Sequence, residues 1–107
     1  MSEDTKTIAL PRLNNLKPSL ESTALKLLEE AGEMAALIGK FRGMSGERVT
    51  MDRQQVVNEI SAELLDVAQT AVTMMFVLEA QYQVDLHALI DEHIRKLLRK
   101  GYLRLEA

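Results

Sequence analysis

Hydrophobic residues recur at helical spacing along most of the chain and predict three helices. In the first of them, successive apolar residues are separated by alternating steps of four and three, the period of one buried helical stripe. The members of this stripe are Leu20, Ala24, Leu27, Ala31, Met34, Ile38 and Phe41. Ser19 or Ser22 is placed to cap the helix, and two glycines weaken its other end, so we expect it to stop near Arg42.

A second helix is predicted from about Arg53 to Gln81, with Asp52 as its N-cap and Gln55 completing a capping box. Its main apolar stripe consists of Val56, Ile60, Leu64, Val67, Ala71, Met74 and Leu78. A second apolar set, made of Leu65, Val72 and Phe76, lies on the opposite side. A helix that is apolar on two sides is buried on two sides, which three helices of one chain do not easily achieve.

A third helix is predicted from about Leu86 to Lys100, capped by Asp85 and ended by Gly101. Its apolar stripe is Leu86, Leu89, Ile90, His93 and Leu97. We expect residues 1–18, which contain both prolines, to form an extended arm, and residues 43–51 to form a loop. The expected fold is therefore all-α, with a single helical domain over residues 19–107. A helical hairpin and a third helix would form a four-helix-bundle-like core completed by a homodimer or homotetramer.

Composition narrows the class of protein. The chain has 107 residues, a formal net charge of −3 and no cysteine, which excludes disulfide scaffolds, zinc–cysteine sites and thiol nucleophiles. The acidic balance argues against a nucleic-acid polymer as partner. No apolar leader is visible, and no uncharged apolar run approaches ~18 residues, so we expect a soluble, cytoplasmic protein that does not span a membrane. A domain this short buries only about 60–68% of its unfolded surface, which also favours assembly.

Acidic residues of the first two helices lie where apolar ones are expected. Glu30 with Glu33, and Glu63 with Asp66, are pairs three residues apart, so each pair shares a helical face. At about 100° per residue, Glu30 and Glu63 fall within the apolar arcs of their helices, whereas Glu29 faces water. The alternative is a solvated acidic face, the commoner role of a Glu-x-x-Glu pair.

Carboxylates that converge at a buried margin need a counter-charge. Lys26 is the only basic side chain on these margins. A hard divalent cation bound through oxygen ligands fits better, with Mg²⁺ as the first candidate and Mn²⁺ as a substitute. Mg²⁺ keeps waters and bridges substrate phosphates, so the acidic strip indicates phosphate chemistry. A di-iron centre is disfavoured, because neither His87 nor His93 has a glutamate three residues before it.

At these residues the sequence resembles the MazG-like family of the all-α nucleoside triphosphate pyrophosphatases, over residues 20–103. That family is marked by Glu-Glu-x-x-Glu on one helix and Glu-x-x-Asp on the next, present here as Glu29-Glu30-Ala31-Gly32-Glu33 and Glu63-Leu64-Leu65-Asp66. The resemblance implies that Glu30, Glu33, Glu63 and Asp66 ligate Mg²⁺. It also implies cleavage of a nucleoside triphosphate to the monophosphate and pyrophosphate, with house-cleaning of non-standard nucleotides as a candidate role.

Further roles follow from this resemblance. Glu59 or Glu29 would orient the attacking water as a general base, and Glu59 is the better candidate because it shares a side with Asp66. Basic residues expected to balance the triphosphate are Lys40, Arg42, Arg48, Lys96 and Lys100. For the basic cluster of the third helix, complementing the helix dipole is an equally good explanation. His93 is more simply interpreted as a core or interface histidine than as a catalytic one.

Two other functions stay open at this point. A non-enzymatic helical module would use the two-sided second helix to bind a partner helix, with its acids solvated. A nucleotide-binding regulator would keep the metal site without turnover. Because a metal-free carboxylate cluster repels itself, the metal hypothesis predicts that Glu30→Gln stabilises the metal-free protein. Under the interaction-module hypothesis the same change is near neutral, as changes of exposed residues are.

Overall fold

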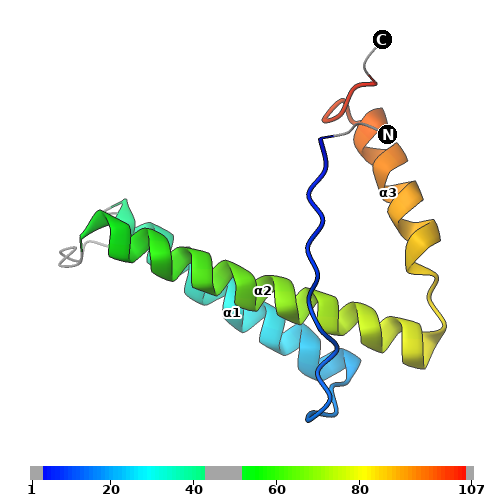
Figure 1. Cartoon of the computed structure of the whole chain (residues 1–107), viewed down its shortest axis with the longest axis horizontal. Coiled ribbons are helices and arrows are strands. Elements are labelled where there is room, and N and C mark those ends of the chain that lie inside the picture. Colours follow the sequence, from blue (N-terminus) through cyan, green and yellow to red (C-terminus); the bar gives the residue numbers. More distant parts are fainter. Residues whose placement is uncertain (1–3, 43–51, 106–107) are drawn as a thin grey trace.

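Two long antiparallel helices and a third helix that turns away from them make up the structure (Figure 1). This computed structural model describes residues 4–42 and 52–105. The helices are α1 (Leu20–Phe41), α2 (Arg53–Tyr82) and α3 (Leu86–Arg99), and the described residues contain no strand. The predicted all-α class and the three helices are confirmed. The predicted loop over residues 43–51 lies outside the described residues.

Local capping explains where the helices begin. The Ser19 hydroxyl accepts a hydrogen bond from the backbone N–H of Ser22 at 3.0 Å, and the Ser22 hydroxyl accepts one from the N–H of Ser19 at 2.9 Å. Asp52 and Gln55 form the same reciprocal box at the start of α2, as the sequence predicts. Asp85 caps α3 by accepting from the N–H of Ala88 at 3.1 Å. Each helix therefore begins after a residue whose side chain accepts a hydrogen bond from one of the otherwise free N–H groups of the first turn.

Left-handed residues mark the ends of the second and third helices. Gln83 follows α2 with a φ of 53°, a conformation that most residues adopt only at a cost. Gly101 follows α3 with a φ of 79°, where the missing Cβ removes that cost. The predicted glycine stop of the third helix is confirmed.

The α1–α2 contact is a narrow and unusually polar seam. Among the described residues, the buried apolar side chains are Val56 and Val77, and the buried polar ones are Thr23, Glu30, Thr70 and Thr73. Part of each predicted apolar stripe instead faces outward, including Ala24, Ile38 and Leu64. The expectation that each whole stripe is buried is thus only partly met in the single chain. Each apolar surface is wider than one neighbouring helix can cover, and the helices meet along its margin.

The extended arm predicted for residues 1–18 is observed over residues 4–18, where it crosses α2 (Figure 1). The side-chain amide of Gln69 donates a hydrogen bond to the backbone carbonyl of Pro11 at 2.9 Å. The Arg12 guanidinium lies 4.3 Å from the centre of the Phe76 ring, a cation–π contact. The arm is therefore attached to α2 by polar and aromatic contacts.

The third helix has no extensive contact with the hairpin within the described residues, and it runs off α2 at a steep angle (Figure 1). Leu89 and Ile90 of its predicted stripe are about half exposed. His93, expected in a core or an interface, is exposed in the single chain. Among the residues that the structure describes, the apolar face of α3 is thus left largely uncovered.

Helix α2 also has the length and composition of a membrane-spanning helix. Its best 18-residue window has a mean hydropathy of 1.3, and only 17% of that window is buried. A single helix of this kind is weak evidence for a membrane span, because core helices of water-soluble proteins share these properties. What the window establishes is a large apolar surface on α2 that the described residues do not cover.

Candidate metal centre

Three carboxylates from the two antiparallel helices meet in the seam. Glu30 and Glu33 lie one turn apart on α1, and Glu63 approaches them from α2. One carboxylate oxygen from each lies within 4.8 Å of those of the other two. The predicted convergence of Glu30, Glu33 and Glu63 is therefore observed.

Lys26 supplies part of the counter-charge that these acids need. Its ammonium lies 2.9 Å from Glu30 Oε1 and 3.8 Å from Glu29 Oε1. The Glu30 side chain is 8% exposed, and its hydrogen bond with Lys26 lowers the pKa of this carboxyl below its ordinary value. Glu30 is thus held as an anion inside the seam. The same hydrogen bond raises the pKa of the Lys26 ammonium.

Glu63 has the opposite environment. Its Oε2 atom is buried and has no hydrogen-bond partner. Burial raises the pKa of the Glu63 carboxyl, and a hydrogen bond with Glu30 and the negative charges of Glu33, Glu30 and Asp66 raise it further. A buried oxygen without a partner normally costs free energy. In such surroundings, the Glu63 carboxylate is stabilised by binding either a proton or a cation.

The donor set fits a hard divalent cation. Its ligands are carboxylate oxygens from two helices, which is the chemistry preferred by Mg²⁺, Ca²⁺ and Mn²⁺ over softer metals. A cation held by Glu30, Glu33 and Glu63 would give the buried Glu63 oxygen its missing partner and offset the repulsion among the three. The acid cluster by itself does not distinguish among these ions.

The other predicted acidic residues are placed around this cluster. Asp66 lies one turn beyond Glu63 on α2, contributes to the negative potential at Glu63, and lines a cavity together with Glu30. Glu59 is exposed one turn before Glu63. Glu29 is 60% exposed and lies beside Lys26. Their predicted roles, as ligand for Asp66 and as general base for Glu59 or Glu29, stay predictions.

The predicted phosphate-binding residues are not gathered at the carboxylates. Lys40 and Arg42 lie at the far end of α1, and Lys40 is about 10 Å along the helix from Glu33. Arg48 lies outside the described residues. Lys96 and Lys100 belong to the end of α3, which has no extensive contact with the hairpin. Within one chain, the structure does not bring the lysines of α3 to the acid cluster.

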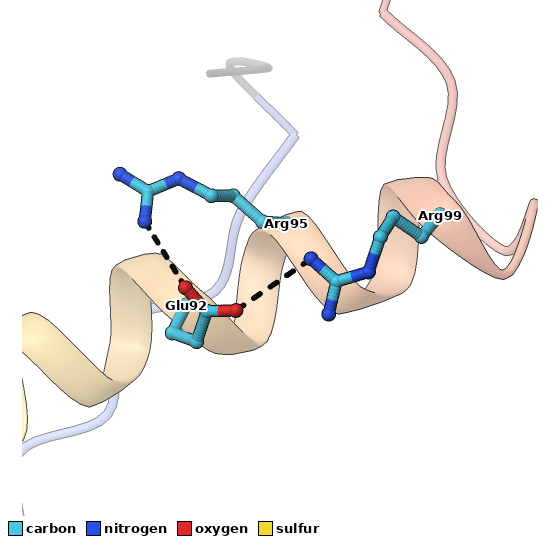
Figure 2. A network of polar contacts seen from close by, with 3 residues as sticks. All are labelled: Glu92, Arg95 and Arg99. Carbon is cyan, nitrogen blue, oxygen red and sulfur yellow. Dashed lines mark hydrogen bonds and ion pairs between the residues drawn. The ribbon is translucent and has the colours of Figure 1, made fainter.

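Other basic residues of α3 have an acidic partner on their own helix. Figure 2 shows Glu92 between Arg95 and Arg99, at 3.2 Å and 3.5 Å. All three side chains are more than half exposed, so these ion pairs contribute little to stability. The basic cluster of α3 is therefore partly neutralised by Glu92.

The sequence interpretation missed a set of residues beside the acids. A cavity of about 420 Å³ opens from Glu30 and Asp66 and runs between the helices and the arm. Thr23, Thr70 and Thr73 line it. Their positions in the sequence could have indicated them, since each threonine lies one or two helical turns from Glu30 or Asp66. The cavity itself could not be predicted from helical spacing, however, because the arm forms one of its walls.

We expect the metal-free protein to lose stability as the pH rises above about 4.5, the ordinary value for glutamate, through the raised pKa of Glu63. A raised folded-state pKa stabilises the fold at pH values below the unfolded pKa, and this contribution is lost as the Glu63 proton leaves. The lowered pKa of Glu30 acts at lower pH, where stability falls as that anion is protonated. Thermal melting in EDTA measures the Glu63 effect between pH 4.5 and 8, and the Glu30 effect below pH 4.5.

The matched comparison is Glu63→Gln, which removes the proton equilibrium but keeps the shape of the side chain. This variant should lack the fall in melting temperature above pH 4.5, whereas Glu79→Gln, an exposed change on the same helix, should keep it. Parallel curves for wild type and Glu63→Gln would contradict the assignment.

Comparison with known proteins identifies one family. The sequence profile described as the MazG nucleotide pyrophosphohydrolase domain matches residues 18–101. This segment contains all three helices and each of the clustered carboxylates. Comparisons with curated proteins and with solved structures found no match.

Proposed function

Because this chain belongs to the MazG nucleotide pyrophosphohydrolase domain family, we propose that it is a Mg²⁺-dependent hydrolase that converts a nucleoside triphosphate to the monophosphate and pyrophosphate. The observation that supports this proposal best is the buried, partnerless Glu63 oxygen within a group of three carboxylates from two helices. A solvated acidic face, as expected of a purely structural helical module, would not bury such an atom.

Each acidic residue then has a role. Glu30, Glu33 and Glu63 would hold the cation, with Asp66 as a fourth ligand one turn along α2. When bound, the cation supplies charge neutralisation for the phosphate oxygens and lowers the pKa of its water. Glu59 is exposed and one turn from Glu63, so it can accept the proton of the attacking water. The water oxygen bonds to one phosphorus of the α–β bridge, the bond from that phosphorus to the bridging oxygen breaks, and the monophosphate and pyrophosphate separate.

Lys26 has a second role in this scheme. In the structure its ammonium is paired with Glu30 at 2.9 Å. Once Glu30 serves as a cation ligand, the Lys26 charge becomes available for a substrate phosphate. Lys26 is half exposed and lines the cavity next to Glu30, so its flexible stem can make this exchange.

We also propose that the protein works as a homo-oligomer. Leucines that one chain leaves more than half exposed lie on both hairpin helices, namely Leu25, Leu28, Leu64 and Leu65. Large apolar side chains left exposed in this way favour an interface in a water-soluble protein. A second copy would complete the helical core, and in such an assembly Lys96 and Lys100 of one chain are free to serve the site of another.

The direct test is to incubate purified, EDTA-treated protein with Mg²⁺ or Mn²⁺ and a panel of standard and modified nucleoside triphosphates. We expect equimolar monophosphate and pyrophosphate from at least one of them, and none when EDTA is retained. Binding of Mg²⁺–nucleotide without product would support the regulator instead. If no product formed and calorimetry detected no Mg²⁺ binding, the hydrolase and the regulator would both be excluded, and the interaction module would be favoured.

A further inference from the structure

The cavity beside the carboxylates has two chemically different walls. The arm contributes mostly apolar surface, from Leu13, Leu16 and Pro18, and one basic residue, Lys17. The helices contribute hydroxyl and amide groups, from Thr23 of α1 and from Gln69, Thr70 and Thr73 of α2. Ligand pockets of proteins typically combine mostly apolar walls with a few polar groups in volumes of roughly 300–1,000 Å³. At about 420 Å³, the cavity lies within that range.

The cavity has a direction that the helices define. Glu30 and Asp66 lie at one end. Thr23 lies seven residues before Glu30 on α1, and Thr73 lies seven residues after Asp66 on the antiparallel α2. Both separations correspond to about 10 Å along a helix. The cavity therefore extends from the acid cluster for a length comparable to that of a nucleoside.

The arm wall is held in place by α2. Pro11 accepts a hydrogen bond from Gln69 at 2.9 Å, and Pro18 accepts one from Gln81 at 3.5 Å. Between them, Arg12 lies over the Phe76 ring. Because these contacts do not use the side chains of Leu13 and Leu16, both leucines are left to line the cavity.

We propose that this cavity binds the nucleoside half of the substrate, with the arm as the wall against which the base packs. The inference rests on the proposed function, because it takes the phosphates to lie at the carboxylate end. A phosphate group would gain little from the leucine and proline surface, whereas a base has apolar faces and polar edges that match both walls. Gln69 Nε2 already donates to Pro11 and Thr73, and the Thr23 hydroxyl donates to backbone carbonyls of its own helix. The Thr73 hydroxyl hydrogen and the Gln69 carbonyl oxygen are the groups of this wall that can contact the polar edges of the base or sugar.

The test separates nucleoside binding from phosphate binding in the full-length chain. Leu13→Ala and Leu16→Ala are compared with wild type, using the preferred nucleotide of the panel and inorganic tripolyphosphate. We expect kcat/KM for the nucleotide to fall about tenfold or more, mainly through KM, since changes in an apolar pocket act at this scale. The dissociation constant of Mg²⁺–tripolyphosphate should not change. Leu105→Ala, a change of the same type in an exposed residue outside the cavity, serves as the control.

A second variant covers the polar wall. Thr73→Val keeps the shape of the side chain and removes its hydroxyl, so it should alter the ranking of bases in the panel while melting remains cooperative. Unchanged nucleotide kinetics in both leucine variants would overturn the inference, as would an equal loss of nucleotide and tripolyphosphate binding. If the wild type hydrolyses no nucleotide, the proposed function itself fails, a result distinct from either of these.

Discussion

Replacement of Glu63 by glutamine is expected to abolish pyrophosphate release and to weaken Mg²⁺ binding by at least about a hundredfold. Changes in residues that only orient metal ligands already cost about 10–100-fold, and under the proposed function Glu63 is itself a ligand. Its Oε2 atom is the buried oxygen that lacks a partner in the metal-free protein. Glutamine preserves the size of the side chain but removes the charge that a divalent cation requires.

Isothermal calorimetry with Mg²⁺ alone and a pyrophosphate-release assay measure these two effects independently. Glu79→Gln, on the same helix but away from the cluster, should leave both at wild-type values. The metal-free Glu63→Gln variant should melt at a higher temperature than wild type at neutral pH, because a neutral amide relieves the charge repulsion around Glu63. A variant that loses activity because it is unfolded would show the reverse, so melting separates the two explanations.

The structure distinguishes Glu63 from Glu30 by their surroundings, which the sequence alone does not do. From the sequence, Glu30 is the natural residue to neutralise, and Glu30→Gln is expected to stabilise the metal-free protein. The structure instead pairs Glu30 with Lys26 at 2.9 Å, and this contact lowers the pKa of Glu30. Removal of the Glu30 charge would therefore break an ion pair. The unfavourable charge lies on Glu63, which has no basic partner among the described residues.

Replacement of Leu65 by aspartate is expected to convert a homo-oligomer into monomers of 12.0 kDa. Leu65 is 55% exposed in the single chain and lies near Leu64 on the outer side of α2. If a second copy covers this side, the new carboxylate would be buried without a partner, at a cost of about 3–5 kcal/mol. Light scattering coupled to gel filtration, over a tenfold range of protein concentration, measures the mass directly.

The control is Leu105→Asp, which introduces the same charge at an exposed residue after α3 and should leave the mass unchanged. Leu28→Asp on α1, where the wild-type leucine is 74% exposed, tests whether the interface extends over both hairpin helices. A wild-type protein that is monomeric at all concentrations would contradict the proposed assembly. So would partition of the wild type into lipid vesicles, which would assign the apolar window of α2 to a membrane.

The sequence predicted those parts of the fold that depend on local interactions. Ser19, Asp52 and Asp85 cap the three helices as expected, and Gly101 ends the third one with a positive φ. Each of these features is decided within about four residues of the chain, where capping and propensity act. The pairing of acids on α1 with an acid on α2 was also predictable, because both motifs lie on helices joined as a hairpin.

Features that depend on rotation and tertiary contact could not be predicted in the same way. The apolar stripes gave the period of the helices but not which margin of each stripe would face the other, so Leu64 was expected inside and is 53% exposed. The attachment of the arm depends on Gln69 and Phe76, which are 58 and 64 residues away from their contacts at Pro11 and Arg12. Nothing in local spacing indicates such pairs, and the cavity between arm and helices follows from them.

The polar seam between α1 and α2 makes folding depend on what the protein binds. Where a stable bundle would place leucine, this chain buries one carboxylate, three threonines and only two valines among its described residues. Burial in the hairpin alone therefore contributes little to the stability of the fold, as is common where a core is also a binding site. Ligands and copies that bind only the folded form raise its stability by mass action. If the chain binds a cation, a nucleotide and further copies of itself, their concentrations set its folded fraction. A molecule that has bound none of them would then unfold most readily.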